Sequence, residues 1–290
     1  MSIPRRRFLQ GCIGAAVCGM PVTPVWARTT LGSAELMTVS DGHLRVPAPT
    51  PVGAALDSTP TERPCNITVL RDGNRTVVFD VGAGPNFVSS AGESVAALED
   101  AGIAPADVTD VLFTHAHPDH FWGVLDDFDE PVFPEARYLM HAAERDYWIH
   151  PDTLPALPEN RQVFASAASR LVTALDDRLE VFNAGDEVAP GIEALATPGH
   201  TPGHCSFVIH REQSSAVVLG DVVVDEAVSF TQPGQPIQGD FDPALAADTR
   251  ANLLTRLAAE RSVLSGFHLT RGGLGYAARD SAGRFHFEPA

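Results

Sequence analysis

The chain has 290 residues, of which 44% are hydrophobic and 20% charged, a composition typical of a folded soluble protein rather than a disordered or collagen-like one. All 20 basic residues are arginines, set against 37 acidic residues, so the formal net charge is −17. Such a surface repels nucleic acids and anionic lipids, and the lack of lysine excludes Schiff-base, pyridoxal-phosphate and P-loop chemistry, each of which needs a lysine amine.

The first 27 residues have the pattern of an export signal. An Arg-Arg-Arg-Phe-Leu run at residues 5–9 resembles the twin-arginine signal, and residues 11–25 form a mild apolar stretch too short for a membrane anchor. Residues 25–27 form a small-x-small pattern that predicts cleavage after Ala27. We therefore expect export by the twin-arginine machinery to the periplasm or beyond, with no membrane anchor left after cleavage. The alternative is a basic cytoplasmic terminus.

Residues 28–290 have the pattern of one mixed α/β domain. A Pro-rich, Thr-rich connector precedes a predicted hairpin of residues 66–70 and 76–80, and it contains Pro47, Pro49, Pro51, Pro60 and Pro64. Hydrophobic periodicity then predicts strands at 111–114, 137–140, 192–196, 205–210, 216–220 and 263–264, and helices at 94–101, 142–149 and 243–259. These predicted elements form two similar halves of the chain, which suggests a duplicated arrangement with two sheets face to face.

Residues 151–177 break this alternation with prolines and then a helical stretch. We interpret them as an insertion or a flap over one edge of the domain.

Metal-competent side chains follow the predicted strand at 111–114. His115, His117, Asp119 and His120 stand within six residues on the loop that leaves this strand. His115 and His117 can point the same way from an extended backbone. A turn at Pro118 would swing the next two side chains toward a neighbouring position. One loop can then serve two metal ions.

Single ligand candidates end three other predicted strands. They are His200 after Thr-Pro-Gly, Asp221 after Leu-Gly and His268 after Ser-Gly-Phe, while Asp80 stands in Phe-Asp-Val-Gly. With the loop at 115–120, these motifs occur in the order found in the metallo-β-lactamase superfamily of hydrolases, which the chain resembles from about residue 35 onward.

The resemblance implies an α/β fold, a four-layer αβ/βα sandwich with two mixed β-sheets face to face. It also implies two divalent metal ions, with zinc expected. The expected ligands are His115, His117 and His200 for one ion, Asp119, His120 and His268 for the other, and Asp221 as the bridge.

A hydroxide between the two ions would attack an ester, lactone or phosphotriester of a small-molecule substrate. Asp119 would also orient this nucleophile and pass a proton to the leaving group. Asp80 would fix the loop geometry from behind the ligands.

Within the superfamily, residues 268–276 and 131–134 most resemble methyl parathion hydrolase and its lactonase relatives. Asp221 favours dinuclear lactonase, phosphotriesterase and thioesterase types over β-lactamases that place Cys or no ligand there. Val224, three residues later, departs from acyl-homoserine lactonases that have a tyrosine at that position. The alternatives are a thioesterase or β-lactamase, an iron-dependent oxidoreductase or oxygenase on the same fold, and a non-catalytic binding protein.

Several assignments stay open from the sequence. His204 also follows a Gly, so either His200 or His204 could be the ligand, and we favour His200 because His204 opens an apolar run. Cys205 is expected near the site as a small buried side chain, and Cys65 and Cys205 are expected to be free thiols rather than a disulfide.

Four aromatic residues are candidates for the substrate pocket, with core packing as the alternative. They are Phe121, Trp122, Trp148 and Phe230. The acidic charge excludes a nucleic-acid partner, and a homodimer stays open.

Overall fold

The computed structural model describes residues 27–56, 58–212 and 214–290. The expected export motif at residues 5–9 and the apolar stretch after it lie outside these ranges. Within them, no helix combines the length and the apolar character needed to cross a bilayer. The described chain begins at Ala27, whose backbone oxygen accepts a hydrogen bond from the Thr38 N–H at 2.9 Å.

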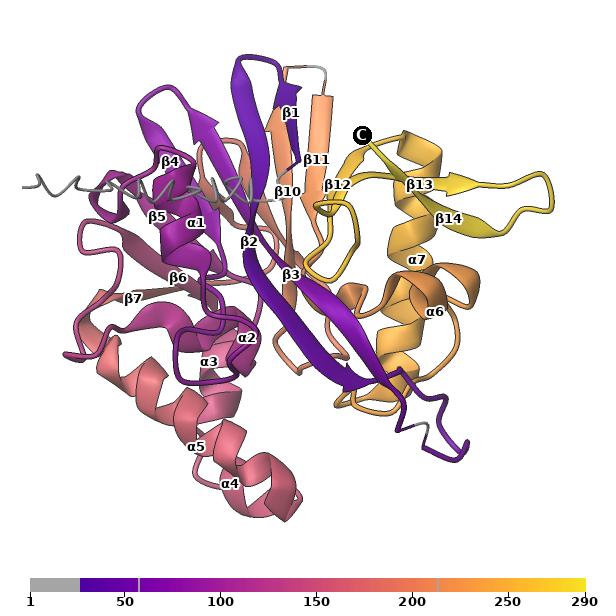
Figure 1. Cartoon of the computed structure of the whole chain (residues 1–290), viewed down its shortest axis with the longest axis horizontal. Coiled ribbons are helices and arrows are strands. Elements are labelled where there is room, and N and C mark those ends of the chain that lie inside the picture. The colour runs from indigo at the N-terminus through magenta and orange to yellow at the C-terminus, as the bar shows by residue number, and fades with distance from the viewer. Residues whose placement is uncertain (1–26, 57, 213) are drawn as a thin grey trace, which may run out of the picture.

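The described strands form two sheets of seven (Figure 1). The first has the order β1-β2-β3-β4-β5-β6-β7, antiparallel from β1 to β4 and parallel from β4 to β7. Its strands are β1 (Arg28–Leu31), β2 (Ala34–Pro47), β3 (Pro60–Asp72), β4 (Arg75–Phe79), β5 (Asp110–Phe113), β6 (Arg137–His141) and β7 (Leu179–Phe182).

The second sheet has the order β14-β13-β12-β11-β10-β9-β8, in which only β11 and β12 pair in parallel. Its strands are β8 (Glu187–Ala189), β9 (Ile192–Ala196), β10 (Cys205–Arg211), β11 (Ser214–Val218), β12 (Val263–Ser265), β13 (Leu274–Arg279) and β14 (Phe285–Pro289). Both sheets are mixed, as expected.

Helices cover the outer face of each sheet (Figure 1). They are α1 (Ser94–Asp100), α2 (Pro118–Phe121), α3 (Ala142–Ile149), α4 (Thr153–Ala156), α5 (Glu159–Ala174), α6 (Glu226–Thr231) and α7 (Pro243–Glu260). Helices α1 and α5 pack with the first sheet, and α6 and α7 flank the second.

Between the sheets lies a separate apolar core, in which the Phe79 and Phe207 rings are 5.5 Å apart. These four layers confirm the sandwich expected from the sequence.

The predicted hairpin is confirmed and is longer than expected. Asp72 pairs with Arg75 across the turn, and Gly73 adopts a φ of +61° there. At its other end, β3 starts at Pro60 and pairs with β2 from Glu35 to Pro47, with one irregularity between Ser40 and Gly42. The predicted connector is therefore wrong at Pro47, Pro60 and Pro64, which lie in strands, but Pro49 and Pro51 lie in the loop between β2 and β3, as predicted. Because β4 pairs only with residues 68–72 of β3, Pro60 and Pro64 lie where β3 has one neighbour, and a missing N–H is tolerated there.

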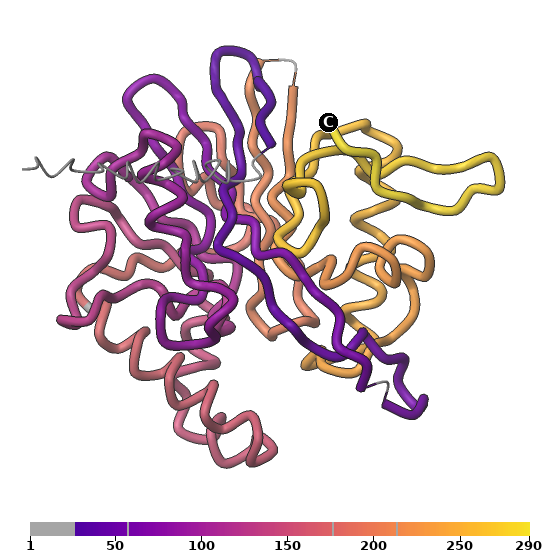
Figure 2. The backbone as a smooth tube through the Cα atoms, in the orientation of Figure 1, coloured from indigo at the N-terminus to yellow at the C-terminus, as the bar shows by residue number. Residues whose placement is uncertain are grey.

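Two segments form the lower end of the molecule as the backbone trace in Figure 2 shows it. The first is the β2–β3 arm with its 48–56 loop, which is held to the segment before α7 because the Gln238 N–H donates to the Thr50 oxygen at 2.7 Å. The second is the pair α4 and α5, built from most of residues 151–177. Both segments contribute to the cavity described below.

Candidate active site

The ligand candidates lie where strands end. His115 and His117 follow β5 directly, and the short helix α2 then presents Asp119 and His120. His200 follows β9, and Asp221 lies in the single turn after β11. His268 follows β12. The described elements thus bring all seven predicted ligands together.

Three imidazoles form a first cluster. Nδ1 of His117 lies 3.0 Å from Nε2 of His115 and 2.9 Å from Nε2 of His200. His115 is fully buried, whereas His117 and His200 face the cavity. Three nitrogens that converge at this spacing can bind one divalent ion.

A second cluster lies beside the first. Nε2 of His268 is 3.3 Å from Oδ2 of Asp119, and Nε2 of His120 is 3.6 Å from the same oxygen. His268 belongs to two candidate cation sets here, one with Asp119 and Cys65 and the other with His120 and Asp221.

Asp221 lies between the two clusters. Its Oδ2 is 3.2 Å from Nε2 of His200, and its Oδ1 is 3.2 Å from Nε2 of His120 and 3.5 Å from Nε2 of His268. One carboxylate oxygen therefore faces each cluster, which is the arrangement a bridging ligand requires.

Three of the ligand histidines have a partner on the outer ring nitrogen that fixes the orientation of the imidazole. Nδ1 of His120 donates to Oδ2 of Asp80 at 2.8 Å, and Nδ1 of His200 donates to Oδ1 of Asp240 at 2.8 Å. Nδ1 of His268 donates to the Pro64 oxygen at 2.8 Å. Such contacts select the tautomer and aim the other nitrogen at a metal.

Asp80 lies where the sequence placed it, behind the ligands. Its two oxygens also accept hydrogen bonds from Thr114, at 2.7 Å from the backbone N–H and 2.8 Å from the hydroxyl. Asp80 itself has a φ of +62°, a strained conformation for a residue with a Cβ. Its carboxylate holds the start of the histidine loop.

His204 is buried between Asp221 and Thr197. Its Nε2 accepts the Asp221 backbone N–H at 2.9 Å, so the neutral ring carries its proton on Nδ1 and donates to the Thr197 hydroxyl at 2.8 Å. Burial, with the neighbouring His200 cation, lowers the pKa of His204 to about 3, which keeps the ring neutral. His204 has no nitrogen left for a metal, whereas His200 has one.

Charge in the cluster is balanced by protons when metals are absent. Burial lowers the pKa of His120, but the carboxylates of Asp221, Asp119 and Asp80 outweigh burial and raise it to about 10. Burial also lowers the pKa of His200, but the Asp221 carboxylate outweighs burial and raises this pKa to about 9. Cations would take the place of these protons on binding.

Buried atoms without partners show that the residues fit metal ions. Within the described residues, Nε2 of His120 and Oδ1 of Asp221 are inaccessible to solvent and make no contact with hydrogen-bond geometry, although they lie 3.2 Å from each other. Leaving such atoms unpaired is costly, and metal coordination at this point would satisfy both. The donor set of imidazole and carboxylate suits zinc.

Glu144, in α3, is a residue that the sequence analysis missed. Its fully buried carboxylate accepts hydrogen bonds from the Ala116 N–H at 3.0 Å, the Thr201 hydroxyl at 2.7 Å and the Gly203 N–H at 3.0 Å. It also accepts the Trp148 indole N–H at 2.7 Å. Glu144 thus ties the histidine loop after β5 to the His200 loop and to one aromatic side chain.

A cavity of about 640 Å³ opens onto the clusters. His117, Asp119, His200, Asp221 and His268 lie in its wall. Its other lining side chains are mostly apolar and include Leu44, Val46, Leu56, Phe87, Tyr147, Trp148, Leu157, Phe164 and Phe241. Arg63, Asn160, Arg161 and Gln238 add polar groups. Residues of the 151–177 segment therefore form part of this wall.

The predicted aromatic pocket residues divide into two groups. Trp148 lines the cavity. Phe121 and Phe230 do not, which corrects the prediction, because Phe121 packs on Phe113 in the core of the first sheet and Phe230 packs under the second. Trp122 lies behind the wall against Phe87, with ring centroids 5.3 Å apart.

The two cysteines of the described chain are both free and buried. The placement of Cys205 near the site is corrected, because its sulfur faces the backbone oxygens of Leu195 and Ser206, each at 3.3 Å. Cys65 is the cysteine that approaches the ligands, with its sulfur within 4.8 Å of ligand atoms of Asp119 and His268.

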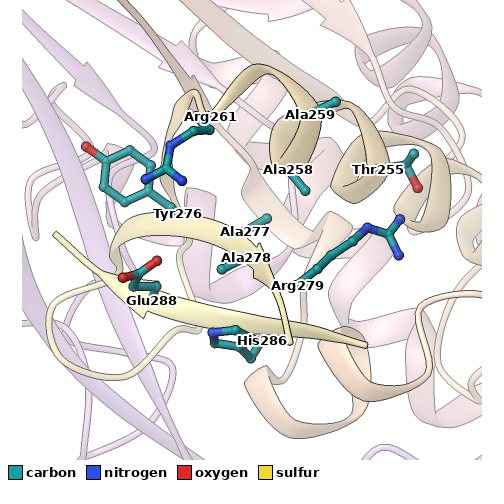
Figure 3. Close-up of a pocket in the computed structure, with 10 residues that line it drawn as sticks. All are labelled: Thr255, Ala258, Ala259, Arg261, Tyr276, Ala277, Ala278, Arg279, His286 and Glu288. Carbon is teal, nitrogen blue, oxygen red and sulfur yellow. The ribbon is translucent and has the colours of Figure 1, made fainter. Parts of the chain in front are cut away.

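A second cavity, of about 460 Å³, lies beside the far end of α7, between that helix and β13 and β14 (Figure 3). Arg261, Tyr276, Arg279, His286 and Glu288 surround it. Its ten lining residues include one histidine and one carboxylate, so it lacks the ligand sets found at the first cavity.

Comparison with known proteins gives a family model and several relatives. The model of the metallo-beta-lactamase superfamily matches residues 60–268. An N-acyl homoserine lactonase of Bacillus thuringiensis is 27% identical over 171 residues, 58% of this chain and 58% of its own length. The lactonase AttM of Agrobacterium fabrum is 30% identical over 121 residues, 41% of this chain and 42% of its own. The chain thus matches less than two thirds of the length of these relatives.

Two solved structures share the fold over nearly their whole length. AidC, described as a dizinc quorum-quenching lactonase, has a TM-score of 0.84 at 24% identity. The match covers 98% of the AidC chain and 92% of this chain. The hydrolase AbOPH of the beta lactamase superfamily has a TM-score of 0.84 at 23% identity and is covered to 99%, with 93% of this chain.

Proposed function

Because the chain belongs to the metallo-β-lactamase superfamily, we propose that it is a dinuclear metal hydrolase that cleaves a lactone or an ester with an apolar acyl group. The observation that carries this proposal is Asp221, whose two oxygens each face one cluster of ligands. The relatives named N-acyl homoserine lactonases add support for lactones.

His115, His117 and His200 would hold one ion, and Asp119, His120 and His268 the other, with Asp221 shared. Bound zinc ions would supply a water activated to hydroxide at neutral pH and a Lewis acid for the substrate carbonyl. Asp80 and Asp240 keep His120 and His200 in the orientation that the ions need.

Asp119 is the residue best placed to move a proton. It stands at the first turn of α2, lines the cavity and has one oxygen against His268. We assign it the orientation of the attacking water, the removal of a proton from that water as the new C–O bond forms, and the transfer of the same proton to the leaving alkoxide oxygen.

The cavity suits a neutral substrate with an apolar chain. Tyr147, Trp148, Phe164 and Phe241 provide wall area against which an acyl chain would be buried. Arg63 lies at the same wall as Asp119 and Asp221 and could hold a carbonyl oxygen.

The test is one sample measured in two ways. Protein purified without added metal is analysed for zinc, iron and manganese per chain and is assayed with a long-chain lactone, a p-nitrophenyl ester and a phosphotriester. About two zinc ions with lactone or ester hydrolysis support the proposal. Iron with oxygen-dependent turnover would replace it with an oxidoreductase, and hydrolysis of the phosphotriester alone would change the substrate class.

We also propose that the chain is exported through the twin-arginine pathway, on the strength of the Arg-Arg-Arg-Phe-Leu run at residues 5–9. Mass spectrometry of the periplasmic protein is expected to find Arg28 as the first residue. Replacing Arg5 and Arg6 with lysine should keep the protein in the cytoplasm. An uncleaved protein that starts at residue 1 or 2 in the cytoplasm would contradict the proposal.

A further inference from the structure

Cys65 places a thiol beside one of the two metal clusters. The residue lies in β3 and is fully buried. The ligand atoms of Cys65, Asp119 and His268 lie within 4.8 Å of one another, a spacing that lets one cation contact all three. In sequence terms Cys65 carries no motif, because it stands 50 residues before the first histidine of the loop.

The neighbours of Cys65 fix its position relative to His268. The Pro64 oxygen accepts the His268 Nδ1–H at 2.8 Å. The side-chain amide of Asn66 donates to the oxygens of Gly266, Phe267 and Leu269 at 3.2, 3.0 and 2.8 Å. Residues 64 and 66 therefore fasten the loop that carries His268 to β3, and the thiol between them is held against that loop.

We propose that Cys65 is a further ligand of the metal ion held by Asp119 and His268. On binding, the S–H bond breaks, a sulfur–metal bond forms and the proton leaves to solvent. The sulfur would give this position a mixed sulfur, nitrogen and oxygen ligand set, which favours zinc, cobalt and cadmium over manganese and magnesium. The inference rests on the proposed function, because it concerns one of the two metal positions on which that function depends.

Cys205 provides a matched control within the same chain. It is also free and fully buried, but its sulfur faces the oxygens of Leu195 and Ser206. In the described structure Cys205 belongs to no group of candidate ligands. A Cys205→Ser change removes a buried thiol without touching the proposed ligand.

The experiment is cobalt substitution of the purified protein that starts at Arg28. The wild type, Cys65→Ser and Cys205→Ser are stripped of metal, loaded with two equivalents of Co²⁺ and examined for the near-ultraviolet thiolate-to-cobalt charge-transfer band. We expect the band in the wild type and in Cys205→Ser and its loss in Cys65→Ser. We also expect Cys65→Ser to bind its more weakly held cobalt at least about tenfold less tightly.

A wild-type spectrum without the band, or a band that survives in Cys65→Ser, overturns the proposal. If Cys65→Ser does not fold, cadmium NMR of the wild type decides instead, since a sulfur ligand moves one cadmium resonance far downfield of a site with nitrogen and oxygen ligands alone. Lactone hydrolysis by a cobalt enzyme without the band would leave the proposed function intact and refute only the role of Cys65. A cobalt protein that shows the band but hydrolyses no lactone or ester would support the role of Cys65 and refute the proposed function.

Discussion

The backbone N–H of Asp221 donates to Nε2 of His204 at 2.9 Å. This contact separates the roles of the two histidines in the doubled Pro-Gly-His motif. His204 supports the backbone of the bridging carboxylate, while His200 aims its own Nε2 at Oδ2 of the same residue from 3.2 Å. Two identical Thr-Pro-Gly-His sequences thus place a positioning residue, His204, and a candidate ligand, His200.

Replacing each histidine should give different defects. His200→Ala is expected to lose about one metal ion per chain, because it removes a ligand of the first cluster. His204→Ala is expected to keep both ions and to lose activity about 10- to 100-fold, because Asp221 loses its support. Metal analysis and lactone assays on the two variants measure this difference. Loss of metal in His204→Ala but not in His200→Ala would refute the assignment.

Removing the Glu144 carboxylate should destabilise the protein. Glu144→Ala leaves four buried donors without an acceptor, so we expect the free energy of unfolding to fall by at least about 3 kcal/mol. Glu144→Gln keeps one acceptor oxygen, so its free energy of unfolding should fall by less than that of Glu144→Ala. Denaturant unfolding measures both, with the exposed Glu99→Gln as the control. Equal stability of Glu144→Ala and the control would show that the carboxylate does not hold the loops together.

Arg63 should affect substrate binding more than turnover. Its Nε is buried and finds no acceptor among the described residues, while another nitrogen, Nη2, donates to the Pro47 oxygen at 2.7 Å. We expect Arg63→Gln to raise KM for a lactone about tenfold with a smaller change in kcat, since a charge-assisted contact is lost. Arg161→Gln, on the same wall but bonded to Gly239, is the control. An unchanged KM in Arg63→Gln would exclude this contact.

Asp41 should make stability fall as the pH rises. Burial raises the pKa of this carboxyl from 3.8 to about 6, although the N–H groups of Ala83 and Ser94 donate to it at 2.9 and 2.8 Å. Between pH 3.8 and about pH 6 the folded protein holds a proton that the unfolded chain has lost. The free energy of unfolding therefore falls as the pH rises through this range, and the loss is complete once the folded protein ionises above about pH 6. The loss is about 3 kcal/mol at neutral pH.

Asp41→Asn does not titrate and isolates this contribution. The stability of the wild type minus that of Asp41→Asn should therefore decrease by about 2 kcal/mol from about pH 4 to about pH 7. Denaturant unfolding of metal-free protein across this range measures the difference. A difference that stays constant with pH would show that the Asp41 carboxyl has an ordinary pKa in the folded protein.

The ligand loops could be predicted because each stands directly after a short apolar strand. His115, His200, Asp221 and His268 follow β5, β9, β11 and β12, and this local pattern survives in the sequence. Glu144 and Cys65 could not be found this way. Each reaches the site through packing between segments far apart in the chain, and neither neighbouring sequence contains a motif.

The N-terminal strands were missed for a similar reason. Prolines at 47, 60 and 64 predict a connector locally, but the long pairing of β2 with β3 makes this region part of the sheet. For Phe121 and Phe230 the error was a different one, because two core residues were predicted to line the pocket. A large aromatic side chain next to a metal loop suggests a pocket, yet both rings pack into the core beneath the sheets.

The most direct test of the account is a crystal structure of the zinc-loaded protein with anomalous scattering measured at the zinc absorption edge. Two peaks are expected about 3.5–4 Å apart, one beside each oxygen of Asp221. A single peak, or two peaks that do not share Asp221, would contradict the central claim that this carboxylate joins two metal positions.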